Sequence, residues 1–113
     1  MKMIYLAHPY AGFTENVCKA TDLERSIADE KIHVFNAVAY FTRYHGMLTE
    51  NQIMARCLDM LCRVDELWMA NGWETSKGCR KEHEFAKKFD IKVVYLDGSG
   101  ERILFDRYGG VEE

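Results

Sequence analysis

The sequence predicts an α/β protein with three layers: a flavodoxin- or Rossmann-like parallel sheet of four to five strands, with helices on both faces. Short runs rich in β-branched and aromatic residues alternate along the chain with longer segments of helical periodicity. The strand-like runs are apolar throughout, as is typical of parallel strands that are buried on both faces. At 113 residues the chain can form one such core, so we predict a single domain over residues 1–113.

The chain begins with a predicted strand over Met1–Ala7, in which apolar strand formers predominate. The loop His8–Gly12 contains the only proline of the sequence together with a glycine, and these residues end the strand. Thr14 is the predicted N-cap of a helix that extends to about Lys31, because apolar residues recur at helical spacing through this segment.

The next segment, Ile32–Phe41, is too apolar for a surface element. We predict that its first half is a buried parallel strand and that its second half leads into a loop. Thr42–Leu48 follows as a polar connector. Thr49 and Gln52 have the spacing of a capping box at the start of another helix. The apolar stripe of that helix consists of Ile53, Met54, Cys57, Leu58, Leu61 and Cys62.

The C-terminal half continues the alternation of strand and helix. Val64–Ala70 is a predicted short strand, and after a polar loop Ser76 is the predicted N-cap of a helix that extends to about Phe89. Ile91–Leu96 is the clearest strand of the sequence, and Arg102–Tyr108 is a candidate edge strand. The residues of the last helix that we expect to face the core are Phe85, Ala86 and Phe89.

Composition and charge narrow the range of functions. The formal net charge of −3 argues against a protein that binds a nucleic-acid backbone, and no apolar run approaches the roughly 18 residues of a membrane span. The N-terminus lacks the pattern of a signal peptide. The four cysteines form no Cys-x-x-Cys pair, which is typical of a reducing compartment. We therefore expect a cytoplasmic protein with no nucleic-acid partner and no membrane partner.

Two loops leave the carboxyl ends of predicted strands, His8–Gly12 and Ala70–Gly78. In parallel sheets ligands bind beyond these ends, where the strand order reverses, so we expect both loops to meet over one pocket. Tyr10 and Trp73 lie in these loops and are candidates for stacking on a flat base. Tyr5 and Trp68, by contrast, are expected to pack in the core.

The helix start at Ser76 allows two interpretations. The hydroxyl of Ser76 and the bare backbone at Gly78 can form a seat for a phosphate or carboxylate group at the positive end of the helix dipole. The same pattern also describes an ordinary N-cap. Glu82, one turn into the helix, is either a carboxylate able to attack or stabilise a cationic carbon, or one more acidic residue that the dipole favours.

Metal and hydrolase motifs are weak in this sequence. Cys79 and His83 lie four residues apart and could form one corner of a metal site, but further ligands at matching spacing are not evident. No serine nucleophile elbow or other hydrolase triad is visible, and nothing favours a cysteine nucleophile. We therefore predict that the protein uses no metal and no cofactor.

Two motifs resemble those of the nucleoside 2-deoxyribosyltransferase-like superfamily, and within it the small, often phage-borne proteins of the DUF4406 type. The first motif is the strand and loop Ile4–Gly12, and the second is Asp65–Trp68 followed by Gly72–Ala86. The resemblance implies that Glu82 is a nucleophile that attacks the anomeric carbon of a nucleotide or nucleoside. It also implies that Ser76 binds a 5′-phosphate. The substrate-binding residues expected on this basis are Ala7, His8, Pro9, Tyr10, Gly12, Trp73, Ser76 and Gly78.

The sequence departs from the pattern of the superfamily at three positions. His8 stands where the first loop often has a glycine, and Arg80 stands where a glycine often precedes the glutamate by two residues. The second catalytic acid is expected from the helix before the third strand, where Asp59 is the candidate. A member with these changes can cleave or transfer an N-glycosidic bond, or it can bind a nucleotide-derived molecule without cleaving it, as in phage–host signalling.

The resemblance further implies a homodimer or a higher homo-oligomer, because enzymes of the superfamily complete their pocket across subunits. A small sheet also covers a pocket incompletely by itself. The aromatic residues expected at such a contact are Phe41, Tyr44 and Tyr108.

Overall fold

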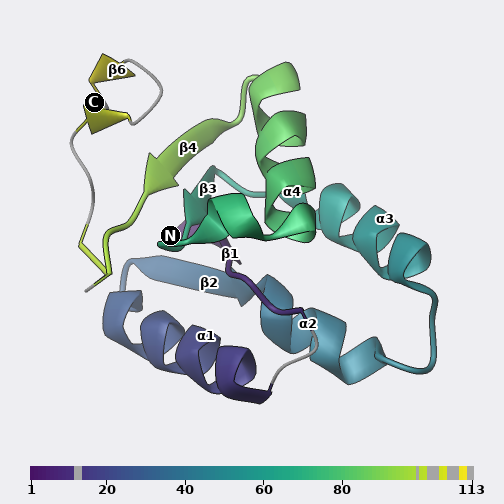
Figure 1. Cartoon of the computed structure of the whole chain (residues 1–113). Helices are drawn as coiled ribbons and strands as arrows, with labels where there is room; N and C mark the ends of the chain where they lie inside the picture. The colour runs from purple at the N-terminus through teal and green to yellow at the C-terminus, as the bar shows by residue number, and fades with distance from the viewer. Residues whose placement is uncertain (12–13, 99, 102–104, 107–109, 112–113) are drawn as a thin grey trace.

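The computed structural model describes residues 1–11, 14–98, 100–101, 105–106 and 110–111. Figure 1 shows the arrangement of its helices and strands. In chain order the elements are β1 (Lys2–Ala7), α1 (Thr14–Ile27), β2 (Ile32–Asn36), α2 (Ala37–Tyr44), α3 (Glu50–Leu61), β3 (Glu66–Met69), η1 (Trp73–Thr75), α4 (Lys77–Lys88), β4 (Lys92–Tyr95), β5 (Phe105–Asp106) and β6 (Gly110–Val111).

The main sheet has four parallel strands in the order β2-β1-β3-β4. Strand β1 is central: Leu6 pairs with Asn36 on one side and with Trp68 on the other. The chain therefore leaves β1 towards β2 and later crosses back to place β3 on the opposite side of β1. The strand order reverses at β1 and β3, and this confirms the predicted α/β fold with its parallel sheet.

Alternation along the strands divides the core into two parts. Tyr5 and Ala7 face α2, α3 and α4, whereas Ile4 and Leu6 face the layer that contains α1. In Figure 1, α1 lies on one side of the sheet and α4 lies on the other. The helices on both faces produce the predicted three layers.

The cluster on the α1 side also holds Trp68, as predicted for a core residue, and it is 3% exposed. Leu23 and Ile27 of α1 pack against this cluster. None of the helices in the described part of the chain is long and apolar enough to cross a membrane.

Helix α2 occupies a segment that we predicted as a loop entry and a connector. The side chain of Asn36 accepts a hydrogen bond from the backbone N–H of Ala39, at 3.1 Å, and so caps the helix. Ala37 and Val38 then become buried in the first turn. The apolar run therefore changes from strand to helix at Asn36, without an intervening loop.

The remaining helix boundaries agree with the prediction in part. The capping box of Thr49 and Gln52 is present at the start of α3, and Ser76 caps α4. Helix α1 ends at Ile27, earlier than predicted, and Asp29 accepts a hydrogen bond from the backbone of Lys31 in the turn that follows.

Two predicted packing assignments are wrong. Phe89 follows the last residue of α4 and is 57% exposed, because the chain turns there into β4. Cys62 caps the end of α3 and is also exposed. Of the predicted edge strand at Arg102–Tyr108 the structure describes Phe105–Asp106, which pairs antiparallel with Gly110–Val111 in a separate two-stranded sheet, and the other residues of that prediction lie outside the described part of the chain.

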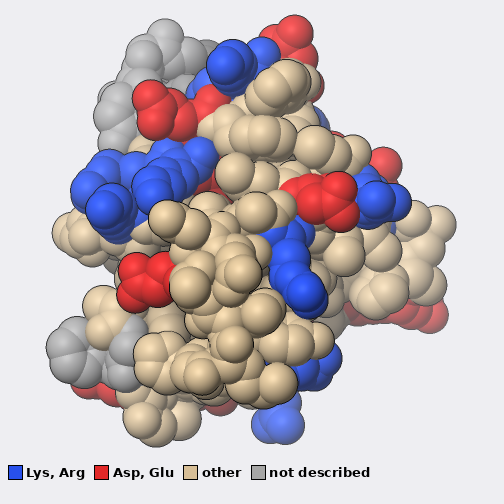
Figure 2. Space-filling model, turned by 90° about the vertical axis from the view of Figure 1, so that its right-hand side faces the viewer, with Lys and Arg blue, Asp and Glu red and all other residues tan. Residues whose placement is uncertain are grey.

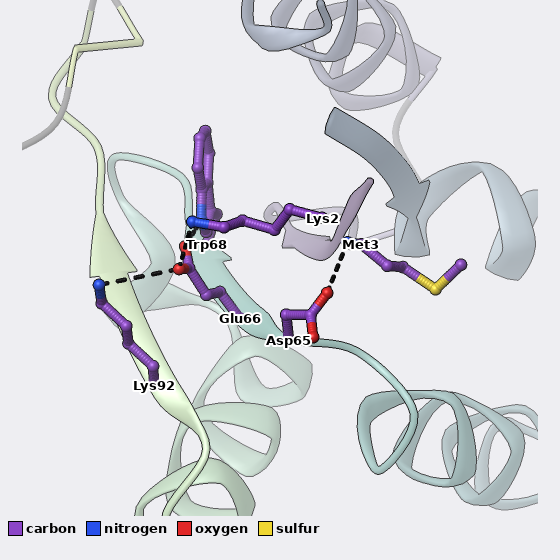
Figure 3. Close-up of polar contacts among 6 residues, drawn as sticks. All are labelled: Lys2, Met3, Asp65, Glu66, Trp68 and Lys92. Atoms are coloured by element: carbon purple, nitrogen blue, oxygen red, sulfur yellow. Dashed lines mark hydrogen bonds and ion pairs between the residues drawn. The ribbon is translucent and has the colours of Figure 1, made fainter. Parts of the chain in front are cut away.

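A charged cluster joins the amino ends of three strands. Figure 3 shows the carboxylate of Glu66 between the ammonium groups of Lys2 and Lys92. Oε2 of Glu66 lies 2.8 Å from Nζ of Lys2 and 3.7 Å from Nζ of Lys92. The indole N–H of Trp68 donates to its other oxygen at 2.8 Å. Burial raises the pKa of Glu66, but these partners outweigh burial and hold the pKa below its ordinary value. The cluster therefore ties β1, β3 and β4 together.

Replacing Glu66 with alanine is expected to lower the free energy of unfolding by about 2–3 kcal/mol, because the indole N–H loses its partner and the charge-assisted bonds are lost. Urea denaturation at neutral pH measures the effect. The control is Asp59→Ala, which removes an exposed ion pair with Arg63 and is expected to cost at most about 1 kcal/mol. Equal costs for the two variants would contradict the structural role of the cluster.

Candidate active site

A cavity of about 850 Å³ lies beyond the carboxyl end of β1. Its wall is formed by the loop after β1, by α2, by the loop between α2 and α3, by the first turns of α3, and by residues within Thr75–Glu82. The backbone N–H of Ala70 donates to the carbonyl of Ala7 at 2.9 Å and holds the ends of β3 and β1 together beside it. Figure 2 shows the side of the molecule on which α2 and α3 lie, and uncharged side chains cover most of its centre.

The cavity contains a buried carboxylate with a single hydroxyl partner. Helix α4 carries Glu82 into the cavity wall, where it is 3% exposed. The hydroxyl of Tyr5 donates a hydrogen bond to Oε2 of Glu82. Tyr5 is fully buried, and its ring packs on Phe35 with 5.1 Å between centroids. Strand β1 therefore fixes the position of the Glu82 carboxyl group from the sheet side.

Burial controls the protonation of Glu82. It raises the pKa of Glu82 to about 7, although the hydrogen bond from Tyr5 acts in the opposite direction. Burial also raises the pKa of Tyr5, and the neighbouring Glu82 raises it further, so Tyr5 remains a neutral donor. Near neutral pH the carboxyl group thus exchanges between acid and carboxylate, as a group that changes charge during a reaction requires.

Two buried thiols lie close to this carboxylate. The thiol of Cys57, from α3, is within hydrogen-bonding reach of the Tyr5 hydroxyl. Cys79 lines the cavity. Burial raises the pKa of both thiols to about 12, and the charge of Glu82 contributes in the same direction. Both cysteines remain protonated at neutral pH, so the carboxylate of Glu82 is the better nucleophile.

The start of α4 brings polar groups to the cavity wall one turn before Glu82. The Ser76 side chain accepts a hydrogen bond from the backbone N–H of Cys79, at 3.3 Å. Ser76, Gly78 and the lysines Lys77 and Lys81 all line the cavity. A Cβ atom added at Gly78 would lie 3.4 Å from the methyl group of Met54, so glycine leaves this turn open. Hydroxyl, backbone and ammonium groups together can bind an anion here.

The loop after β1 contributes two of the predicted substrate-binding residues. His8 and Tyr10 both line the cavity and are half-buried. The side-chain amide of Asn16 donates to the Tyr10 carbonyl at 2.8 Å, and this bond ties the loop to α1. The ring of Tyr10 lies 6.4 Å from that of Phe41. Helices α1 and α2 therefore position the loop over the cavity.

The family model described as DUF4406, a domain of unknown function, matches residues 2–95. The chain belongs to the DUF4406 family. No curated protein matches it in sequence. Its fold is similar to that of a solved structure described as a 2-desoxiribosyltransferase from Leishmania mexicana, with a TM-score of 0.65 and 14% sequence identity. The match covers 86% of this chain and 65% of the transferase chain. The likeness confirms the predicted fold.

Trp73, which we predicted to stack on a bound base, lies in the core of the DUF4406 domain and not in the cavity wall. Gly72, with a φ of 85°, turns the chain and directs the 3-10 turn inward. Trp73 is 6% exposed and stacks on His83, with ring centroids 4.3 Å apart. His83 in turn contacts the hydroxyl of Tyr95 at 2.7 Å. The aromatic side chain left at the cavity by the two predicted loops is Tyr10.

Two other predicted substrate contacts are not found in the cavity wall of the DUF4406 domain. Ala7 is fully buried at the end of β1, and its carbonyl is bound by the backbone of Ala70. The carbonyl of Pro9 accepts a hydrogen bond from His8, and Pro9 does not line the cavity. Gly12 lies outside the residues that the structure describes.

The predicted second acid is also absent from the cavity. Asp59 is exposed and pairs with Arg63 at 3.3 Å, on the outer side of α3. The second carboxylate among the described residues that line the cavity is Glu50, at the exposed start of α3. Over the same described part of the chain, no group of three or more His, Cys, Asp or Glu side chains is placed to hold a metal ion.

Sequence reasoning missed Tyr5 and Cys57 as parts of the site. Tyr5 lies within an apolar strand, and this pattern predicts only a core position. The hydroxyl of Tyr5 is the feature that could have indicated a role in the site, because the hydroxyl of a buried tyrosine usually has a hydrogen-bond partner. The identity of that partner depends on the packing of α4 against β1, and Glu82 lies 77 residues further along the chain.

Proposed function

We propose that the protein cleaves or transfers the N-glycosidic bond of a nucleotide or nucleoside, with Glu82 as the nucleophile. The observation that carries this proposal is the buried pair of Glu82 and Tyr5 at the wall of a large cavity. The similarity of the fold to that of a 2-desoxiribosyltransferase supports the same chemistry.

The geometry suits a two-step reaction. Tyr5 binds Oε2 of Glu82, so Oε1 is the oxygen available to attack the anomeric carbon. In the first step a bond forms between Oε1 and this carbon, and the bond from carbon to the base nitrogen breaks with its electron pair. In the second step water or another base displaces Glu82, and the configuration at carbon is retained.

The charge at the start of α4 favours a nucleotide over a nucleoside. Ser76, the backbone at Gly78, and the ammonium groups of Lys77 and Lys81 would bind the phosphate. Tyr10 would contact the base.

We also propose that the protein forms a homo-oligomer, with α2 at the contact. Phe41 and Tyr44 lie half-buried on this helix, whereas Tyr108 lies outside the described residues.

The direct test is an assay of base release from a panel of deoxynucleotides, ribonucleotides, their nucleosides and NAD-type compounds. We expect release of the base from at least one nucleotide and slower release from the matching nucleoside. A glycosyl-enzyme ester at Glu82, detected by mass spectrometry after rapid quenching, would identify the nucleophile. No release from any compound at high enzyme concentration would refute the catalytic proposal.

Substitution of Ser76 by alanine tests the phosphate seat. We expect KM for the nucleotide to rise by about 10-fold, because one hydrogen bond to a charged phosphate is lost. The kinetics with the corresponding nucleoside should change little. The control is Ser26→Ala, at an exposed serine of α1 whose hydroxyl donates to the Leu23 carbonyl. An equal loss for nucleotide and nucleoside would show that Ser76 acts only as a helix cap.

Substitution of Tyr5 by phenylalanine tests the role of the hydrogen bond between Tyr5 and Glu82. The hydrogen bond from Tyr5 lowers the pKa of Glu82, so its loss is expected to move the acidic limb of the kcat/KM profile from about pH 7 to higher pH. The expected shift of this acidic limb is roughly one pH unit or more, since a hydrogen bond to a charged group contributes ~1.5–3 kcal/mol. An unchanged limb would show that another group titrates.

Binding without cleavage is the second candidate function, and the position of Asp59 favours it. Without that acid in the cavity, protonation of the leaving base falls to solvent. Calorimetry followed by chromatography of the recovered ligand separates the two functions. Intact ligand after prolonged incubation, together with a measurable heat of binding, would support capture.

A further inference from the structure

The ring of His8 is held in one orientation and in one tautomer. Its Nδ1 atom lies 2.8 Å from the carbonyl oxygen of Pro9. A carbonyl oxygen can only accept a hydrogen bond, so Nδ1 must carry the hydrogen. In the neutral ring the other nitrogen, Nε2, is then an acceptor with a free lone pair.

The environment of His8 keeps the ring neutral. Burial lowers the pKa of His8, the bond to the Pro9 carbonyl raises it, and the charge of Lys19 lowers it, with a net value below the ordinary one. The ring therefore holds its lone pair at neutral pH. His8 lines the same cavity as Glu82, and it comes from the loop after β1 whereas Glu82 comes from α4.

We propose that Nε2 of His8 is the general base that activates the incoming water or acceptor base in the second step of the reaction. This inference rests on the proposed glycosyl transfer at Glu82. In the second step the anomeric carbon of the glycosyl ester must be attacked from the side that the departed base occupied, opposite the Glu82 carboxylate. The neutral imidazole of His8 lines the cavity from an element other than α4 and can accept this proton, whereas the predicted acid Asp59 pairs with Arg63 outside the cavity wall.

The second step balances with His8 as the proton acceptor. The water oxygen forms a bond to the anomeric carbon while the bond from this carbon to the Glu82 oxygen breaks, and its electron pair returns to the carboxylate. One proton of the water passes to Nε2, which gives an imidazolium. The imidazolium later releases this proton to solvent, and in the first step the departing base takes one proton from solvent.

Two substitutions of His8 separate proton transfer from hydrogen bonding. In His8→Asn the side-chain amide keeps a donor near the position of Nδ1 for the Pro9 carbonyl. In His8→Gln the amide oxygen keeps an acceptor near the position of Nε2. Neither amide is a base, so we expect both variants to slow the second step by about 10²-fold or more. The matched control is His33→Asn, at an exposed histidine of β2 outside the cavity wall.

The measurement is quench-flow assay of base release from the nucleotide that the wild-type protein cleaves. Each His8 variant should show a burst of base equal to the enzyme concentration, followed by slow turnover, and the glycosyl ester on Glu82 should accumulate. Sodium azide should restore turnover and yield a glycosyl azide, because azide attacks without losing a proton. The His33→Asn control should keep wild-type kinetics.

Four results would overturn the proposal. Equal slowing of the burst and of turnover would mean that His8 only binds substrate or shapes the loop. Wild-type turnover in His8→Gln would mean that an acceptor is sufficient. No base release by the wild-type protein would refute the glycosyl transfer itself. If the wild-type protein releases base over many turnovers and the His8 variants show no burst, only the role of His8 would be refuted.

Discussion

Replacing Glu82 with glutamine is expected to reduce base release by a factor on the order of 10⁴ or more, because the amide cannot form the glycosyl ester. Glutamine has nearly the shape of glutamic acid, and its amide oxygen can still accept the hydrogen bond from Tyr5. The cavity should therefore keep its form, and ligand affinity should change little. Steady-state assays and calorimetry on the same preparation measure the two quantities.

The matched control for this loss is Glu84→Gln. Glu84 lies two residues further along α4 and is exposed, so the same chemical change there should leave the rate unchanged. A rate for Glu82→Gln within about 10-fold of the wild-type rate would show that Glu82 lines the cavity without reacting. Retained binding with complete loss of turnover would place the nucleophile at this carboxylate.

The same substitution is expected to stabilise the protein at alkaline pH. Burial raises the pKa of Glu82 from an ordinary 4.5 to about 7, so between these values the folded state holds a proton that the unfolded state has lost. The stability of the wild-type protein therefore falls as pH rises through this window and is level above it. The loss amounts to about 3 kcal/mol, since one pKa unit corresponds to about 1.4 kcal/mol.

Urea denaturation of wild type and Glu82→Gln at pH 4, 6 and 8 tests this directly. The two proteins should have similar stability at pH 4, where both side chains are uncharged. At pH 8 the variant should be more stable by up to about 3 kcal/mol. Glu84→Gln should track the wild-type protein at every pH. Parallel curves for wild type and Glu82→Gln would mean that the carboxyl group ionises as freely in the fold as in the unfolded chain.

Elements with strong local signals could be predicted from the sequence. The capping box at Thr49 and the N-cap at Ser76 depend on residues within one turn, and both are present. Helix α2 was missed because its cap, Asn36, is also the last residue of β2, and the apolar run crosses this boundary without a turn residue. Periodicity alone does not separate a buried strand from a buried helix over so few residues.

The loops that form the cavity, and Glu82 in the helix that follows Ser76, could be predicted from the sequence, but several other side chains could not. The direction of each side chain depends on register and packing, which the sequence specifies over long distances. Two residues apart on a helix, side chains point to nearly opposite faces, and so α3 turns Cys57 towards Tyr5 while Asp59 faces solvent. The turn at Gly72 likewise sends Trp73 into the core.

The charged cluster around Glu66 has a consequence for how this protein tolerates change. It stabilises the amino ends of β1 and β3, whereas the cavity lies beyond the carboxyl ends of the sheet. Substitutions at the cavity that alter substrate choice usually lower the free energy of unfolding. A protein tolerates them only while its stability stays above the threshold that folding requires. Laboratory evolution started from a variant that lacks Glu66 should therefore yield fewer folded, altered-specificity clones than evolution started from the natural sequence.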